Sequence, residues 1–142
     1  MLRDKENMMR FLTRILLLSV LCIGLMSCDD DQETIDSIIA GRSWTGDIGM
    51  VDEFGEPLIS TFSFGYDGFG KETQYYEFDG LFYDSYRFQW FWEDSYSRNL
   101  VLDYGRNGVS YMDNVRVSGG RMYGTFYIDD YSEGVDFVLY ME

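Results

Sequence analysis

Phe82-Tyr-Asp-Ser-Tyr-Arg-Phe-Gln-Trp-Phe-Trp92 is the stretch of sequence that decides the fold class. Its large aromatic residues Tyr86, Phe88, Trp90 and Trp92 occupy every second position. Successive side chains of a β-strand point to opposite faces, so these four rings share one face. The period of two therefore predicts a strand with one buried face.

The same alternation continues on both sides of this stretch, and from Ser43 onward no segment has helical periodicity. Turn signals such as Asp67-Gly68 and Asn107-Gly108 separate the apolar segments every 8–12 residues or so, which is typical of a sandwich or a barrel. We expect eight strands, over residues 43–51, 57–65, 68–78, 83–92, 98–105, 108–117, 120–128 and 134–141.

Consecutive hairpins predict an antiparallel meander. An open sheet would leave its edges unpaired, whereas about eight short strands can close around side chains or one small ligand. The sequence thus predicts an all-β fold, a small antiparallel up-and-down barrel. Beyond the aromatic strand, its inner face is expected to consist of Phe62, Phe64, Leu100, Leu102, Tyr104, Val115, Val117, Met122, Phe126, Ile128, Val135, Phe137, Leu139 and Met141.

The 142 residues leave room for one domain after a secretory signal. Basic residues near the start precede an apolar run over residues 15–26, which is too short to span a bilayer and is typical of a signal peptide. We expect a signal peptide over residues 1–27, an acidic tether over 28–40 and the barrel domain over 41–142. Translation could start at Met1, Met8 or Met9.

Leu25-Met26-Ser27-Cys28 resembles the lipobox of bacterial lipoproteins. The resemblance implies cleavage before Cys28 and attachment of lipid to its thiol, which would tether the chain to a membrane. The acidic run Asp29-Asp30-Asp31 looks like the surface-export signal of Bacteroides lipoproteins. We therefore expect an outer membrane lipoprotein exposed at the cell surface, with the periplasmic face as the alternative.

Residues 40–142 resemble the lipocalin-like domains of small Bacteroides-type lipoproteins. The likeness rests on Trp44 in Gly41-Arg-Ser-Trp-Thr-Gly46, on Phe62-Ser-Phe-Gly-Tyr-Asp-Gly-Phe-Gly70, and on Phe88-x-Trp90 followed by Leu100-x-Leu102-x-Tyr104. This chain spaces its first glycine and tryptophan as Gly-x-x-Trp, where lipocalins have Gly-x-Trp. The resemblance implies a fold more than a function.

Charge and composition exclude several classes of function. Residues 28–142 hold seven basic residues against 23 acidic ones, a net charge of −16, which disfavours nucleic acid. The chain has no histidine, and we expect no enzyme, no disulfide, no cofactor and no metal site. Asp129-Asp130-Tyr-Ser-Glu-Gly-Val-Asp136 lacks the EF-hand spacing, and weak calcium binding there stays open.

Four aromatic residues should point away from the core: Phe91, Tyr123, Tyr127 and Tyr140. We predict that they contact a ligand or partner, although ordinary cross-strand packing is the alternative. The barrel mouth, placed near Trp92 and Asp94, is the other candidate.

The sequence favours a non-enzymatic extracytoplasmic binding module for a small ligand or glycan. The alternative is an acidic inhibitor or immunity protein that neutralises a cationic lysozyme or antimicrobial toxin, and a purely structural surface protein is a third possibility.

Overall fold

The computed structural model describes residue 5 and residues 30–142. The predicted signal peptide and the lipidation residue Cys28 lie outside the described residues. The chain divides into two compact units, residues 1–33 and residues 34–142.

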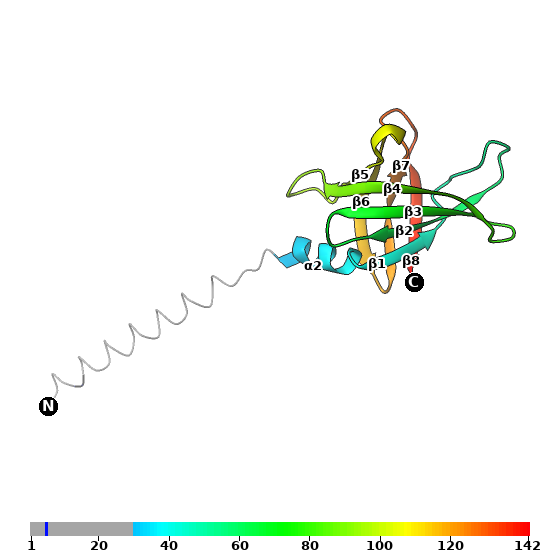
Figure 1. Cartoon of the computed structure of the whole chain (residues 1–142). Coiled ribbons are helices and arrows are strands. Elements are labelled where there is room, and N and C mark those ends of the chain that lie inside the picture. The colour runs from blue at the N-terminus through cyan, green and yellow to red at the C-terminus, as the bar shows by residue number, and fades with distance from the viewer. Residues whose placement is uncertain (1–4, 6–29) are drawn as a thin grey trace. The chain divides into compact units, whose positions relative to one another are not determined.

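The second unit contains a closed antiparallel barrel in which each strand pairs with its neighbours in sequence (Figure 1). Trp44 and Thr45 of the first strand pair with Met141 and Tyr140 of the last, which closes the barrel. The predicted all-β, up-and-down barrel of eight strands is confirmed. Its strands are β1 (Arg42–Gly46), β2 (Leu58–Phe64), β3 (Phe69–Tyr76), β4 (Phe82–Trp92), β5 (Leu100–Asp103), β6 (Val109–Ser118), β7 (Arg121–Tyr127) and β8 (Val135–Met141).

Local sequence explains the hairpins and one irregularity. Gly119 and Gly120 connect β6 to β7 with φ angles of 58° and 73°, the left-handed pair that suits a two-residue hairpin loop. The β6–β7 register shifts between Asp113 and Arg116. Asn114, with φ of 54°, lies in this bulge, and its backbone N–H donates to Asn99 Oδ1 at 3.2 Å.

Aromatic packing fills much of the interior. Phe64 meets Phe88 and Trp90 edge to face, with ring centroids 5.5 Å apart in each case. Most of the predicted inner residues are buried or partly buried. Ile128, Val135 and Met141 are the exceptions, because they lie at or beyond strand ends, where the barrel wall no longer covers them.

A helix that the sequence did not predict precedes the barrel. Helix α2 (Asp30–Ile39) overlaps the segment predicted as a tether, and the second unit begins at Thr34, within this helix. Ile39 is fully buried, and Ile35 and Ile38 pack against the core. The three isoleucines have the i, i+3, i+4 spacing of one helix face, which explains why this segment is helical.

No helix among the described residues has the length and apolar character needed to cross a membrane.

The loops of an up-and-down barrel alternate between its two ends. Gly41 N–H donates to Phe64 O at 2.7 Å, and Trp92 Nε1 donates to Asp36 Oδ1, so residues 34–39 of α2 lie at the end where β2 and β4 finish. We call this the closed end. The opposite end, the open end, carries the loops over residues 47–57, 77–81, 104–108 and 128–134 (Figure 1).

Candidate functional site

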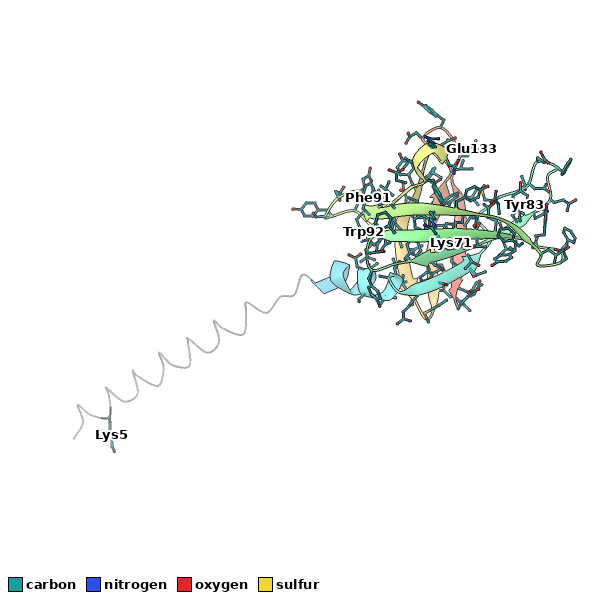
Figure 2. The ribbon with its side chains drawn as sticks, in the orientation of Figure 1. Lys5, Lys71, Tyr83, Phe91, Trp92 and Glu133 are labelled. Carbon is teal, nitrogen blue, oxygen red and sulfur yellow. The ribbon has the colours of Figure 1, made fainter. Side chains whose placement is uncertain are left out.

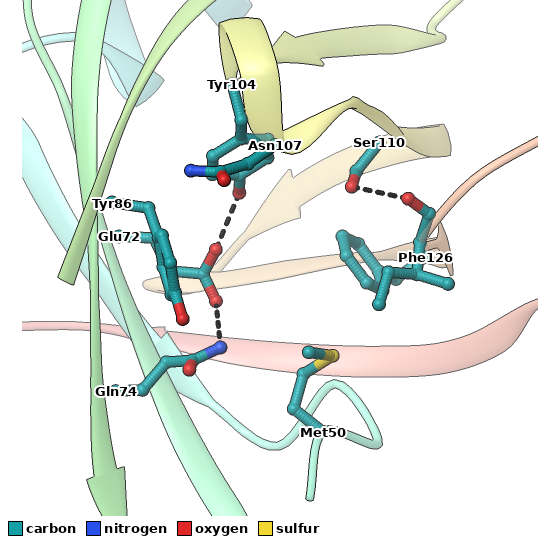
Figure 3. A pocket seen from close by; sticks show the side chains of 9 residues that line it. Met50, Glu72, Gln74, Tyr86, Tyr104, Asn107, Ser110 and Phe126 are labelled. Atoms are coloured by element: carbon teal, nitrogen blue, oxygen red, sulfur yellow. Dashed lines mark hydrogen bonds between the residues drawn. The ribbon is translucent and has the colours of Figure 1, made fainter. Parts of the chain in front are cut away.

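A cavity of about 260 Å³ lies in the barrel at the open end. Its wall combines apolar side chains with polar ones. In Figure 3, Glu72, Gln74 and Tyr86 come from β3 and β4 on one side, and Ser110 and Phe126 come from β6 and β7 on the other. The full lining is Met50, Glu72, Gln74, Tyr86, Tyr104, Asn107, Ser110, Phe126 and Ile128.

Register places a carboxyl group inside this wall. Lys71 and Glu72 are adjacent on β3, and the pairing of Glu72 with Phe62 turns Glu72 inward and Lys71 outward. Glu72 is 4% exposed, and Gln74, two residues on, is also buried. An ionisable group in a barrel interior is unusual, because moving a charge out of water is costly unless the charge is paired.

Three neutral groups donate hydrogen bonds to Glu72. Its Oε1 accepts from Ser60 Oγ at 2.8 Å and from Gln74 Nε2 at 2.9 Å. Its Oε2 accepts from the hydroxyl of Tyr104 at 2.6 Å (Figure 3). Such donors fix the position of the carboxylate, and its negative charge is left without a cation among these partners.

The two tyrosines of the cavity stay protonated at neutral pH. Burial raises the pKa of Tyr104 well above its usual range, and the neighbouring charge of Glu72 adds to the shift. Burial, followed by the hydrogen bond to Asp84 at 3.0 Å, raises the pKa of Tyr86 to about 12. Both phenols therefore act as hydrogen-bond donors in the site.

The raised pKa of Tyr86 predicts a loss of stability at alkaline pH. A neutral phenol favoured in the fold stabilises it below the unfolded pKa of about 10, and this contribution is lost as pH rises toward about 12. When urea unfolding is measured between pH about 10 and about 12, the free energy of unfolding should fall less for Tyr86→Phe than for the wild type. Tyr131→Phe, at a 97% exposed position, serves as the control and should follow the wild type. Equal slopes for Tyr86→Phe and wild type would contradict the prediction.

The four outward aromatic residues form two separate groups. Phe91 and Tyr127 belong to one row across the outer wall, because Phe91 pairs with Val101, Val101 with Tyr111, and Tyr111 with Tyr127. Phe91 is 48% exposed, whereas Tyr127 is partly buried. Figure 2 shows Phe91 next to Trp92 at the end of β4.

Tyr123 and Tyr140 form the second group, together with two arginines. The guanidinium carbon of Arg116 lies 5.9 Å from the ring centroid of Tyr123, and that of Arg121 lies 5.5 Å from the ring centroid of Tyr140. Each tyrosine thus already has a cation–π partner within the chain. This arrangement favours the cross-strand packing alternative, while a contact with a partner stays a prediction.

A second hollow, of about 300 Å³, lies beside the β6 bulge. Arg116, Tyr123, Thr125 and Asp136 are among its lining residues. Thr125 Oγ1 donates to Asp136 Oδ1 at 2.8 Å, so these two side chains satisfy each other. This hollow gives less reason to expect a ligand than the interior cavity with its unneutralised carboxylate.

The barrel mouth predicted near Trp92 and Asp94 does not coincide with the cavity, and ligand binding at that mouth stays a prediction. Trp92 lies at the closed end, where its indole N–H donates to Asp36 of α2. The cavity lies at the opposite end. Strand alternation says which face a residue is on, but it does not say which end of a barrel a helix will cover.

The acidic hairpin after β7 uses its first carboxylate to hold its own turn. Asp129 Oδ1 accepts from the backbone N–H groups of Tyr131 and Ser132 at 2.9 and 2.7 Å and from the Ser132 hydroxyl at 2.7 Å. These bonds to Ser132 and Tyr131 lower the pKa of Asp129. The carboxylate thus stabilises the loop, as aspartates commonly do in turns.

Sequence reasoning missed Glu72 and Gln74, although it contained a signal for them. In residues 68–78 neither alternate set of positions is mainly apolar, whereas in both neighbouring strands one set is mainly apolar or aromatic. A barrel strand has one inward face, so at least one polar side chain had to point inside.

Comparisons with protein-family models, with curated proteins and with solved structures find no match to this chain.

Proposed function

We propose that this chain is a lipid-anchored, non-enzymatic binding module that holds a small molecule in its open-end cavity. The observation that carries the proposal is a cavity inside a closed barrel whose wall includes the buried polar residues Glu72, Gln74 and Ser110. Ligand sites are typically apolar hollows with a few well-placed polar groups. The cavity is slightly smaller than the ~300–1,000 Å³ of common ligand pockets, which suits a small ligand.

The sequence features support an extracytoplasmic location for this module. The lipobox-like Leu25-Met26-Ser27-Cys28 supports a lipid anchor on Cys28, and the acidic run after it supports display on the surface of the outer membrane. The periplasmic face of that membrane is the alternative.

Blocking the mouth of the cavity tests ligand binding. Asn107 lines the cavity from the exposed turn η1 (Gly105–Asn107), so Asn107→Phe should fill the entrance without altering the core. A panel of small amines, sugars, alcohols and carboxylic acids is screened by thermal unfolding of the wild type. A panel compound at 100 times its Kd should stabilise the fold by about 2.7 kcal/mol, which corresponds to a rise in Tm of roughly 11–22 °C for a domain of about 100 residues. The rise should largely vanish in Asn107→Phe.

The neighbouring residue provides a matched control. Arg106→Phe adds the same ring to the same exposed turn, at a residue that does not line the cavity, and should keep the response. Equal stabilisation of wild type and Asn107→Phe would place the ligand elsewhere. If no compound of the panel stabilises the wild type, the result would favour the second candidate function, an inhibitor or immunity protein.

The second candidate is an inhibitor or immunity protein that binds a cationic protein, and the loops at the open end favour it. Phe54, Phe78 and Tyr131 at these loop tips are 83%, 70% and 97% exposed. Exposed aromatic side chains are common in protein interfaces, and acidic neighbours would steer a cationic partner toward them. Those acidic neighbours are Glu53, Glu56, Glu77, Asp79, Asp130 and Glu133, the last of which is labelled in Figure 2.

A further inference from the structure

The charge of Glu72 indicates the class of ligand. The carboxylate is 4% exposed, lines the cavity and accepts hydrogen bonds from the neutral side chains of Ser60, Gln74 and Tyr104. Carboxylate oxygens offer about four acceptor sites together, and these three bonds leave Oε2 with room for another donor. A buried charge without a counter-charge is costly, so a cation in the cavity would relieve that cost.

The basic side chains of the barrel unit do not supply the cation. None of the seven arginines and lysines in residues 34–142 lines the cavity. Lys71 and Arg87 occupy opposite positions of the β3–β4 pair on the outer wall. Arg116 and Arg121 lie over outer tyrosine rings. The remaining ones, Arg42, Arg98 and Arg106, are exposed.

Aromatic rings beside the carboxylate add a second feature that suits a cation. Tyr86 and Tyr104 both line the cavity, and their rings meet at 84° with centroids 6.4 Å apart. The face of an aromatic ring attracts an organic cation, and the attraction is stronger where water is excluded. Asp84, which accepts the hydrogen bond of Tyr86, places another carboxylate next to this pair.

We propose that the cavity binds a small organic cation, a primary ammonium or amidinium compound, whose charged group pairs with Glu72 next to the rings of Tyr86 and Tyr104. The proposal rests on the proposed function, because it assigns a ligand class to the same cavity. Met50, Phe126 and Ile128 form the apolar part of the wall and would cover the rest of the ligand. The net charge of −14 would further attract cations to the protein.

A pair of probes with nearly the same shape tests the charge. Benzylamine and benzyl alcohol are titrated into the wild-type chain by calorimetry at neutral pH. The amine should bind at least about tenfold more tightly than the alcohol, since a charge-assisted bond replaces a neutral one. Glu72→Gln keeps the size of the side chain and should abolish that preference while leaving the affinity for the alcohol within about twofold.

Glu53→Gln removes one negative charge from an exposed loop position and should preserve the preference, which separates local pairing from the overall field. If Glu72→Gln does not fold, the ratio of the wild-type affinities for benzylamine and benzyl alcohol still tests whether the cavity prefers a cation. Equal affinity for both probes would overturn the cationic class and leave the cavity as a site for neutral ligands. Failure of both probes to bind would also overturn it, and the wider panel with Asn107→Phe would then decide whether the cavity binds anything.

Discussion

Labelled fatty acid should be incorporated into the wild-type chain in its native host, and Cys28→Ala should abolish the incorporation completely. Cys28 follows the lipobox-like Leu25-Met26-Ser27, and its thiol is the expected acceptor. Two or more acyl chains hold a protein firmly at a membrane, so removing them should move the protein from the membrane fraction to the soluble fraction. The measurement is labelling followed by fractionation.

The other cysteine supplies the control. Cys22 lies inside the apolar run and is preceded by Leu21, a bulky residue where the lipobox requires a small one. Cys22→Ala should therefore keep both the label and the membrane association. Labelling that persists in Cys28→Ala would refute the lipoprotein proposal, while the barrel and its cavity would be unaffected.

The barrel could be predicted because its determinants are local. Alternation over Tyr86, Phe88, Trp90 and Trp92 sets the inner face of one strand without reference to any other. Short turns such as Gly119-Gly120 then force neighbouring strands to run antiparallel. Repeated hairpins of this kind leave few topologies other than a meander.

The helix that precedes the barrel could not be found in the same way. Ile35, Ile38 and Ile39 have helical spacing, but they lie among the polar residues of a segment that begins Asp-Asp-Asp and looks like a solvated spacer. Their burial depends on contacts with the barrel core, which the sequence of this segment alone does not contain. Tertiary packing of the isoleucines, rather than local preference, therefore explains why this segment is helical.

The candidate site depended on register. Glu72 faces the cavity because it pairs with Phe62, and a slip of one residue would have put Lys71 there instead. Sequence alternation in β3 does not choose between them, since both faces are polar. On the outer wall, alternation correctly predicted that Tyr123 and Tyr140 point outward. It could not predict that Arg116 and Arg121 would lie over their rings.

Trp44→Ala is expected to lower the free energy of unfolding by about 3–5 kcal/mol, the usual cost of removing a large buried aromatic side chain. Trp44 is fully buried in β1 and pairs with Phe62 on one side and Met141 on the other. The substitution therefore opens a void at the strand that closes the barrel. Because domains of this size are stable by only about 5–15 kcal/mol, urea unfolding should show a large shift of the midpoint.

An aromatic residue on the outer wall provides the matched control. Phe91 is 48% exposed, and Phe91→Ala should cost no more than about 1 kcal/mol. Trp44 has a further role, because its Nε1 donates to Ile39 O at 3.4 Å at the end of α2. Trp44→Phe removes this bond but keeps a ring in the core. Its loss in free energy of unfolding should therefore lie between the losses of Trp44→Ala and Phe91→Ala. If Trp44→Ala cost no more than Phe91→Ala, the closure of the barrel around β1 would be refuted, since only a packed interior distinguishes the two positions.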